Sequence, residues 1–150
     1  MQKAFTMIEL IFVIVIIGIL AAVAIPRLSA TRVDAKVATK ANEIASVANE
    51  VASYAVSKGR TLTGIPQMSN LATSMINKGS ATYSSSSKTL NVKMSTVSDC
   101  IRLTLTESNN DVNLTMSYGN ANADKDCLAL QHVVDRGNYH IPLRGLVLAY

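Results

Sequence analysis

The most pronounced pattern in the sequence is an almost unbroken run of apolar residues close to its start. Residues 5–25 read FTMIELIFVIVIIGILAAVAI, and 18 of these 21 positions are apolar. No charged residue occurs from Leu10 to Ile25. As an α-helix the run would be roughly 24–31 Å long, which is enough to cross the hydrocarbon core of a membrane.

Three interpretations of this run compete. A buried core helix is one, although a chain of 150 residues would rarely cover such a helix on every side. A secretory signal peptide is the second, and Ala22-Val23-Ala24 supplies a small-x-small cleavage site for it. A retained membrane helix is the third, and it is the one that the sequence favours.

Glu9 bears on this choice because it is the one carboxylate inside the run. At the middle of a bilayer a carboxylate costs roughly 2.5–3.5 kcal/mol, and a signal peptide has no use for one. A simpler alternative places Glu9 at the helix edge, near the headgroups and the positive helix N-terminus, with no further role. Both readings of Glu9 fit a retained helix.

Beyond Pro26 the apolar positions become periodic, with spacings of three and four that predict an amphipathic helix. The apolar stripe consists of Val37, Ala41, Ile44, Ala48, Val51 and Ala55. Another face carries Lys36, Glu43, Glu50 and Ser57, with Ser46 and Ser53 beside them. We expect the helix to end near Lys58-Gly59 and its stripe to pack on a globular region.

The remaining residues predict a small α+β region. The expected elements are a linker at 59–66, a helix from Gln67 to Lys78, a loop at Ser84–Ser87, strands at Thr89–Ser95, Cys100–Thr106 and Asp111–Tyr118, and a last strand or hairpin around Arg144-Gly145. Alternating apolar residues give each of the three strands one buried face. The fold class is therefore α+β, with a long N-terminal helix packed on a small antiparallel meander.

The segment Lys3-Ala4-Phe5-Thr6-Met7-Ile8-Glu9-Leu10 resembles the processing signature of type IV prepilins and pseudopilins. The resemblance covers residues 3–25 and implies a pilin-like fold. It implies that prepilin peptidase cuts between Ala4 and Phe5 and then N-methylates Phe5. Glu9 matches the acidic residue of the family, whereas Ala4 stands where Gly is more common.

Cleavage would create a new α-amino group, which is largely cationic at neutral pH. A carboxylate in an apolar bundle requires a cationic partner, so we expect Glu9 to meet the Phe5 amine of its own or an adjacent subunit and to set the assembly register. Gly18 and Pro26 both weaken the helix. By resemblance to filament-forming members, the segment between them is a candidate hinge.

The resemblance implies a division into a leader (1–4), a membrane and polymerisation helix (5–26), an amphipathic helix (27–58) and a globular region (59–150). It implies a precursor in the inner membrane, with the globular region in the periplasm, and a cell-surface pilus or periplasmic pseudopilus after assembly. Expected partners are copies of the chain itself, minor pilins or pseudopilins, prepilin peptidase, an inner-membrane assembly platform with an ATPase, and membrane lipid.

Cys100 and Cys127 are the two cysteines, and an exported globular region favours a disulfide between them. In the resembling family such a C-terminal cystine is typical of pilins and generally absent from major pseudopilins. A Cys2His2 zinc site with His132 and His140 is the alternative, but its close ligand pairs are missing. We expect His132 on a helix surface and His140 in a strand, with no metal or other cofactor.

Charge and composition exclude several classes of function. The net charge of +4 is spread thinly along the chain, and no basic block indicates nucleic-acid binding. No nucleotide loop, catalytic triad or paired-acid pattern occurs, so no enzyme is expected. Asn113 begins an N-x-T sequon inside a predicted strand, which leaves its glycosylation open.

The preferred function is a filament-forming prepilin. Alternatives are a pseudopilin of a type II secretion or DNA-uptake system, and a membrane-anchored periplasmic module that does not polymerise.

Overall fold

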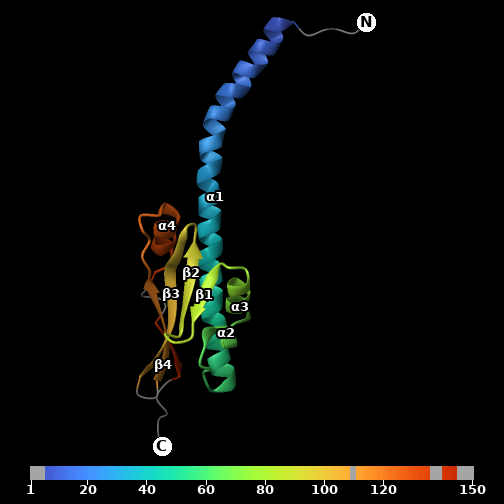
Figure 1. Ribbon diagram of the computed structural model, residues 1–150. Helices are drawn as coiled ribbons and strands as arrows, with labels where there is room; N and C mark the ends of the chain where they lie inside the picture. Colours follow the sequence, from blue (N-terminus) through green and yellow to red (C-terminus); the bar gives the residue numbers. More distant parts are fainter. Residues whose placement is uncertain (1–5, 109–110, 136–139, 145–150) are drawn as a thin grey trace, which may run out of the picture. The chain divides into compact units, whose positions relative to one another are not determined.

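A computed structural model describes residues 6–108, 111–135 and 140–144, and these residues form four helices and five strands (Figure 1). The chain divides into two compact units between Lys36 and Val37. We call the residues up to Lys36 the N-terminal unit and those from Val37 onwards the C-terminal unit.

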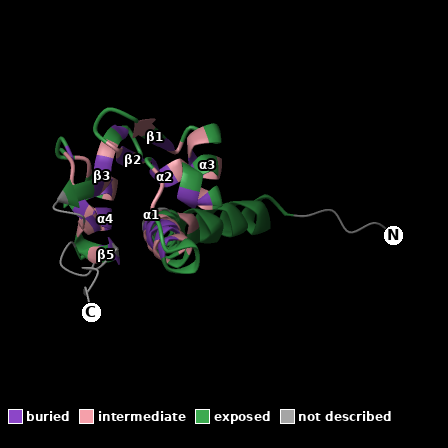
Figure 2. Ribbon diagram, turned by 90° about the horizontal axis from the view of Figure 1, so that it is seen from below, coloured by how far each residue is buried: buried purple, intermediate pink, exposed green. Residues whose placement is uncertain are grey.

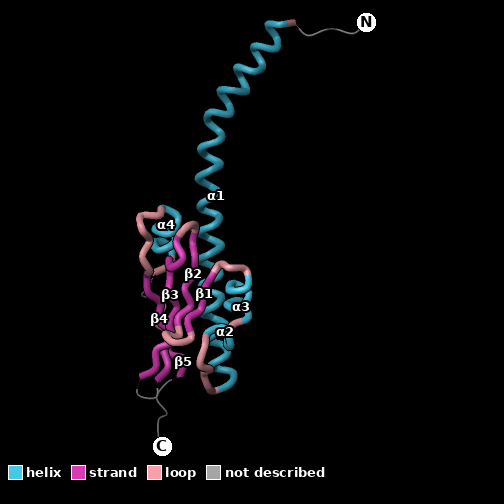
Figure 3. The backbone as a smooth tube through the Cα atoms, in the orientation of Figure 1, coloured by secondary structure: helices cyan, strands magenta, loops and turns pink. Residues whose placement is uncertain are grey.

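Helix α1 (Met7–Lys58) belongs to both units and is 52 residues long. It stays helical through Gly18 and Pro26, as the continuous tube in Figure 3 shows. Its last residue confirms the predicted end at Lys58, and Gly59 follows with a φ of 61°. This left-handed conformation ends a helix at little cost in glycine.

The amphipathic pattern of α1 is confirmed within the C-terminal unit. Five residues of the predicted stripe are buried and the sixth, Ala41, is half-buried. The buried positions are Val37, Ile44, Ala48, Val51 and Ala55, and Val47 joins them. This part of the helix therefore contributes one layer of a core.

The other layer is a five-stranded antiparallel sheet in the order β1-β2-β3-β4-β5. Its strands are β1 (Ala81–Ser84), β2 (Thr89–Met94), β3 (Val97–Ser108), β4 (Asp111–Tyr118) and β5 (Ile141–Arg144). Each strand pairs with the next along the chain, so the predicted meander is confirmed. The long helix followed by this sheet is an α+β layout that fits a type IV pilin-like fold.

Alternating residues of the strands are buried, so one face of the sheet is covered, and Figure 2 colours the buried positions along the ribbon. Leu90 of β2 is opposite Leu103 of β3, which is opposite Met116 of β4. Leu90 and Leu103 are completely buried, and Met116 is nearly so. The buried face of the sheet and the stripe of α1 thus form one core, as expected for two layers.

The single helix predicted from Gln67 to Lys78 is wrong in one respect: two helices occur, α2 (Ile65–Met68) and α3 (Asn70–Asn77). The predicted linker at 59–66 also ends too late. The break lies at Ser69, whose backbone is extended and whose hydroxyl accepts a hydrogen bond from the Ala72 amide at 3.0 Å. Ser69 is therefore the N-cap of α3 rather than a helical residue.

Glu50 explains why the chain breaks at that point. Its Oε2 accepts hydrogen bonds from the Ser69 hydroxyl at 2.7 Å and from the Leu71 amide at 3.1 Å. A carboxylate at a helix N-terminus is favourable because the first amides lack backbone partners. Glu50, which the sequence pattern places on the face opposite the apolar stripe, is half-buried, and its hydrogen bonds fix α3 to α1.

Two elements lie outside the residue ranges that the sequence prediction gave, although the placement of His132 on a helix anticipated the second of them. Strand β1 includes Ser84, which was expected to begin a loop, and α4 (Lys125–Val133) lies against β2 and β3. Strand β3 begins at Val97, before the predicted start at Cys100. The strand expected around Arg144 is β5, and His140 lies directly before it rather than inside it.

Candidate functional site

The first turn of α1 is closed by reciprocal hydrogen bonds between Thr6 and Glu9. Glu9 Oε2 accepts from the Thr6 amide at 2.8 Å and from the Thr6 hydroxyl at 2.7 Å, while the Glu9 amide donates to Thr6 Oγ1 at 3.3 Å. This arrangement is a capping box, in which an N-cap Thr and the Glu three residues on satisfy each other's amides. The Glu9 carboxylate therefore has a partner within a single chain.

The capping box was not predicted, although the pattern Thr-x-x-Glu directly before an apolar run is its usual signature. A cationic partner was expected for Glu9, whereas the Thr6 hydroxyl three residues earlier binds it in the structure. Ala4 and Phe5, the expected cleavage and methylation residues, lie outside the described residues.

From Met7 to Leu28 the surface of α1 is mostly apolar and exposed. The large apolar residues from Met7 to Leu28 are uncovered, and Figure 2 shows this part of the helix as exposed. Among the described residues α1 is the one helix long and apolar enough to cross a membrane, and none of its apolar window is buried. A core helix would have this surface covered, and none of the described residues covers it.

Gly18 and Pro26, the candidate hinge residues, both lie inside this helix. A Cβ added at Gly18 would meet no atom within 4 Å, so no contact among the described residues requires a glycine there. Pro26 removes one backbone donor from the helix interior. The two residues weaken the helix locally while it stays continuous.

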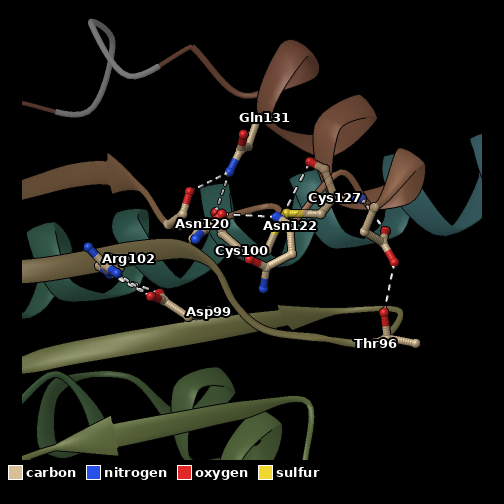
Figure 4. Close-up of a disulfide and its surroundings, with 10 residues drawn as sticks. Thr96, Asp99, Cys100, Arg102, Asn120, Asn122, Cys127 and Gln131 are labelled. Carbon is tan, nitrogen blue, oxygen red and sulfur yellow. Dashed lines mark hydrogen bonds and ion pairs between the residues drawn. A yellow bond between two sulfur atoms is a disulfide. The ribbon is translucent and has the colours of Figure 1, made fainter.

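In the C-terminal unit a disulfide joins Cys100 of β3 to Cys127 of α4, with a Cα–Cα distance of 5.7 Å (Figure 4). Both cysteines are completely buried. Because the sulfur atoms are bonded to each other, neither offers a thiolate to a metal. His132 is exposed on α4, as expected, and His140 is exposed before β5.

Gln131 and Gly119 form hydrogen bonds with the backbone next to the disulfide. Gln131 Nε2 donates to the carbonyls of Cys100 and Gly119, at 2.9 and 3.1 Å, and the Gly119 amide donates to the Cys100 carbonyl at 2.9 Å. A Cβ at Gly119 would lie 1.9 Å from the Asp99 carbonyl oxygen. The close approach of two backbone segments therefore requires a glycine at this position.

Asp124 ties the start of α4 to the turn between β2 and β3. Its Oδ1 accepts from the Cys127 amide at 2.9 Å, and its Oδ2 accepts from the Thr96 hydroxyl at 3.0 Å. These hydrogen bonds, that from the Cys127 amide foremost, lower the pKa of Asp124 below its usual value. Asp124 is thus the N-cap of α4. Figure 4 labels Thr96 and draws its hydrogen bond to this carboxylate as a dashed line.

Arg102 and Asp99 form an ion pair on β3 in which Nε donates to both carboxylate oxygens, at 2.9 and 3.0 Å. The hydrogen bonds and charge of Asp99 raise the pKa of Arg102 above its usual value. The pair orients Asp99 where its backbone passes close to Gly119, because a planar guanidinium holds a carboxylate in a fixed geometry.

Residues 1–25 match the model of the prokaryotic N-terminal methylation motif. No curated protein and no solved structure matches the chain. The match covers the apolar run, Glu9 and the four residues that precede Phe5. The chain therefore carries, at its N-terminus, the prepilin-type cleavage and methylation motif of type IV pilins and pseudopilins.

Proposed function

We propose that the chain is the prepilin of a type IV pilus-like filament, cut between Ala4 and Phe5, N-methylated at Phe5 and polymerised through α1. The observation that carries this proposal is the uncovered apolar surface of α1 next to the methylation motif. A membrane anchor would account for the apolar surface, but it would need neither the motif nor a carboxylate at its start.

In this proposal two different partners cover the same apolar surface, one after the other. In the precursor, lipid covers the helix, and in the filament, copies of the same helix replace the lipid. Both covers are apolar, so transfer from one to the other changes little in hydrophobic free energy. Polar contacts are then left to select one arrangement of subunits.

Glu9 supplies that selection. Before cleavage its carboxylate is bound by Thr6, which lowers the cost of keeping it at the membrane edge. After cleavage the Phe5 amine provides a cation, and a carboxylate pairs more strongly with a cation than with a hydroxyl in an apolar environment. Register is set where the Glu9 of one subunit meets such an amine.

The proposed division of labour follows the chain: a leader at 1–4, a membrane and polymerisation helix at 5–26, an amphipathic helix at 27–58 and an exported globular region at 59–150. The disulfide fits export, since disulfides persist in oxidising compartments. Prepilin peptidase, an assembly platform with its ATPase, and other pilins are the partners that this route requires. The segment from Gly18 to Pro26 is the proposed hinge.

Two substitutions separate the register role of Glu9 from its capping role. Glu9→Gln keeps a capping side chain but removes the charge, and Thr6→Val removes the capping hydroxyl but keeps the charge. We expect filaments in the shear fraction from Thr6→Val and none from Glu9→Gln, with both proteins stable in the membrane. Normal filaments from Glu9→Gln would overturn the register role.

The shear fraction also separates a pilus from a pseudopilus. An abundant surface filament of the wild-type chain supports a pilin. A processed chain that stays in the membrane and never enters the shear fraction contradicts it and favours a pseudopilin of a secretion or DNA-uptake system.

A further inference from the structure

An open groove of about 680 Å³ lies on the surface of the C-terminal unit between α1, α2 and the start of α3. Its volume is in the range of small-molecule sites in proteins, although it is open to solvent along one side. Seven of its eight lining residues carry a polar group, and Met68 is the exception, while apolar atoms contribute the larger share of the exposed lining. The prepilin motif does not involve this groove, and nothing in filament assembly as proposed above uses it.

The α1 wall of the groove repeats at helical spacing. Asn49, Ser53 and Ser57 follow one another at intervals of four residues and so lie on one face of the helix, with Tyr54 beside them. In the described part of the chain, the side chains of Asn49 and Ser53 form no hydrogen bond. Their amide and hydroxyl groups are therefore available to a ligand.

The opposite wall comes from Gln67 of α2 and Asn70, the first residue of α3. Both are exposed. Gln67 Oε1 accepts a hydrogen bond from the Thr63 hydroxyl at 3.3 Å, whereas the Asn70 side chain has no hydrogen-bond partner among the described residues. Amide groups thus face the groove from two separate elements.

The groove carries one formal negative charge. None of the lining residues in the described chain is Lys, Arg or His, and Glu50 is its one charged group. The Glu50 carboxylate is already bound by the Ser69 hydroxyl and the Leu71 amide at the positive end of α3. A lining without cations is unsuited to phosphate, sulfate or an acidic peptide. An open groove with a polar group on seven of its eight lining residues does not enclose an acyl chain.

What remains is a neutral ligand with many hydroxyl groups. Carboxamides and hydroxyls both donate and accept, so they match the mixed donors and acceptors around a sugar ring. A tyrosine offers a flat apolar ring with a polar tip, which suits the C–H face of a pyranose. We propose that this groove binds a short uncharged oligosaccharide, with Tyr54 as the stacking residue and Asn49, Ser53 and Asn70 as the hydrogen-bonding residues.

Saturation-transfer NMR on the full chain in lipid nanodiscs tests this proposal, because nanodiscs avoid sugar-based detergents that would occupy the groove. The probes are N-acetylchitotriose, which represents a cell-wall glycan, and lacto-N-tetraose, which represents a surface glycan of another cell. Sialyllactose is the anionic comparison. We expect saturation of one neutral probe and little of sialyllactose, and the preferred probe identifies the source.

Matched variants assign the binding to the groove. Asn70→Ala and Tyr54→Ala should each weaken binding of the preferred probe about tenfold, whereas Tyr54→Phe should keep it. Asn77→Ala is the control, because Asn77 is an exposed asparagine at the other end of α3 and does not line the groove. Near-ultraviolet circular dichroism checks that each variant keeps the wild-type fold.

Three results would overturn the proposal. One is the absence of saturation transfer to either neutral probe, and another is binding that persists in both Asn70→Ala and Tyr54→Ala. The third is a loss of filaments in these variants without any sugar binding by the wild type, which would make the groove a contact between copies of the chain. The test uses the unprocessed chain, so its outcome does not depend on cleavage or polymerisation.

Discussion

The two units of the chain use the same apolar residue types in opposite ways. Ile14 in the N-terminal unit exposes 57% of its surface, whereas Ile44, thirty residues further along the same helix, exposes 0%. The C-terminal unit covers most of its apolar residues with its own elements. The N-terminal unit leaves them exposed, and in the proposed function lipid and then other subunits cover them.

A pair of isoleucine substitutions tests this difference between the two units and has the largest expected effect. Ile44→Ala should lower the free energy of unfolding of the C-terminal unit by about 4 kcal/mol, because it leaves a cavity in a closed core. Ile14→Ala should leave that free energy unchanged. Denaturant unfolding of the full chain in detergent, followed by tyrosine circular dichroism, measures both, and equal effects would contradict the contrast.

A glycine pair should give the next largest effect. Gly119→Ala places a Cβ against the Asp99 carbonyl and should cost about 3 kcal/mol, since two backbone segments must move apart. The Cβ of Gly18→Ala meets open space, so this substitution should instead stabilise the helix by about 1 kcal/mol. The same unfolding measurement applies to Gly119→Ala. A midpoint equal to that of the wild type would contradict the close approach of Gly119 to the Asp99 carbonyl.

A smaller effect separates two glutamates of α1. Glu50→Gln removes the charge that caps α3 and should cost about 1 kcal/mol in stability. Glu43→Gln weakens a partly exposed pair with Lys40, 2.7 Å long, and should cost about half as much or less. The order of the two unfolding midpoints tests the assignment, and the reverse order refutes the capping role of Glu50.

The smallest expected effect is on the loss of stability at low pH, to which Asp124 contributes. The pKa of Asp124 is lower in the folded chain than in an unfolded one, so its contribution is complete above the unfolded pKa and is lost as the pH falls through the folded value. Melting temperatures measured from about pH 5 down to about pH 3 should therefore fall slightly more for the wild type than for Asp124→Asn. Identical slopes would remove Asp124 from the acid response.

Local patterns predicted the parts of the fold whose neighbours are close in sequence. Spacings of three and four gave α1 and its end at Gly59, and alternation gave most of β2, β3 and β4. Strand β1 escaped because four residues carry too little alternation beside a serine run. The break at Ser69 escaped because its cause, Glu50, lies 19 residues away and acts through space.

The candidate site divides in the same way. The apolar run and Glu9 were readable because the motif is contiguous, and so in principle was the capping hydroxyl of Thr6. The support of the disulfide by Gln131, and the groove between α1 and α3, were not readable from the sequence. They join residues whose proximity arises only when the sheet and helices pack.

The proposed processing is tested by intact-mass and N-terminal peptide mass spectrometry of the chain recovered from its native membrane and shear fractions. We expect a mature chain that lacks residues 1–4 and begins at Phe5 with one added methyl group on its α-amine. A chain that keeps Met1 to Ala4, or one cut after Ala24 as by a signal peptidase, would contradict it.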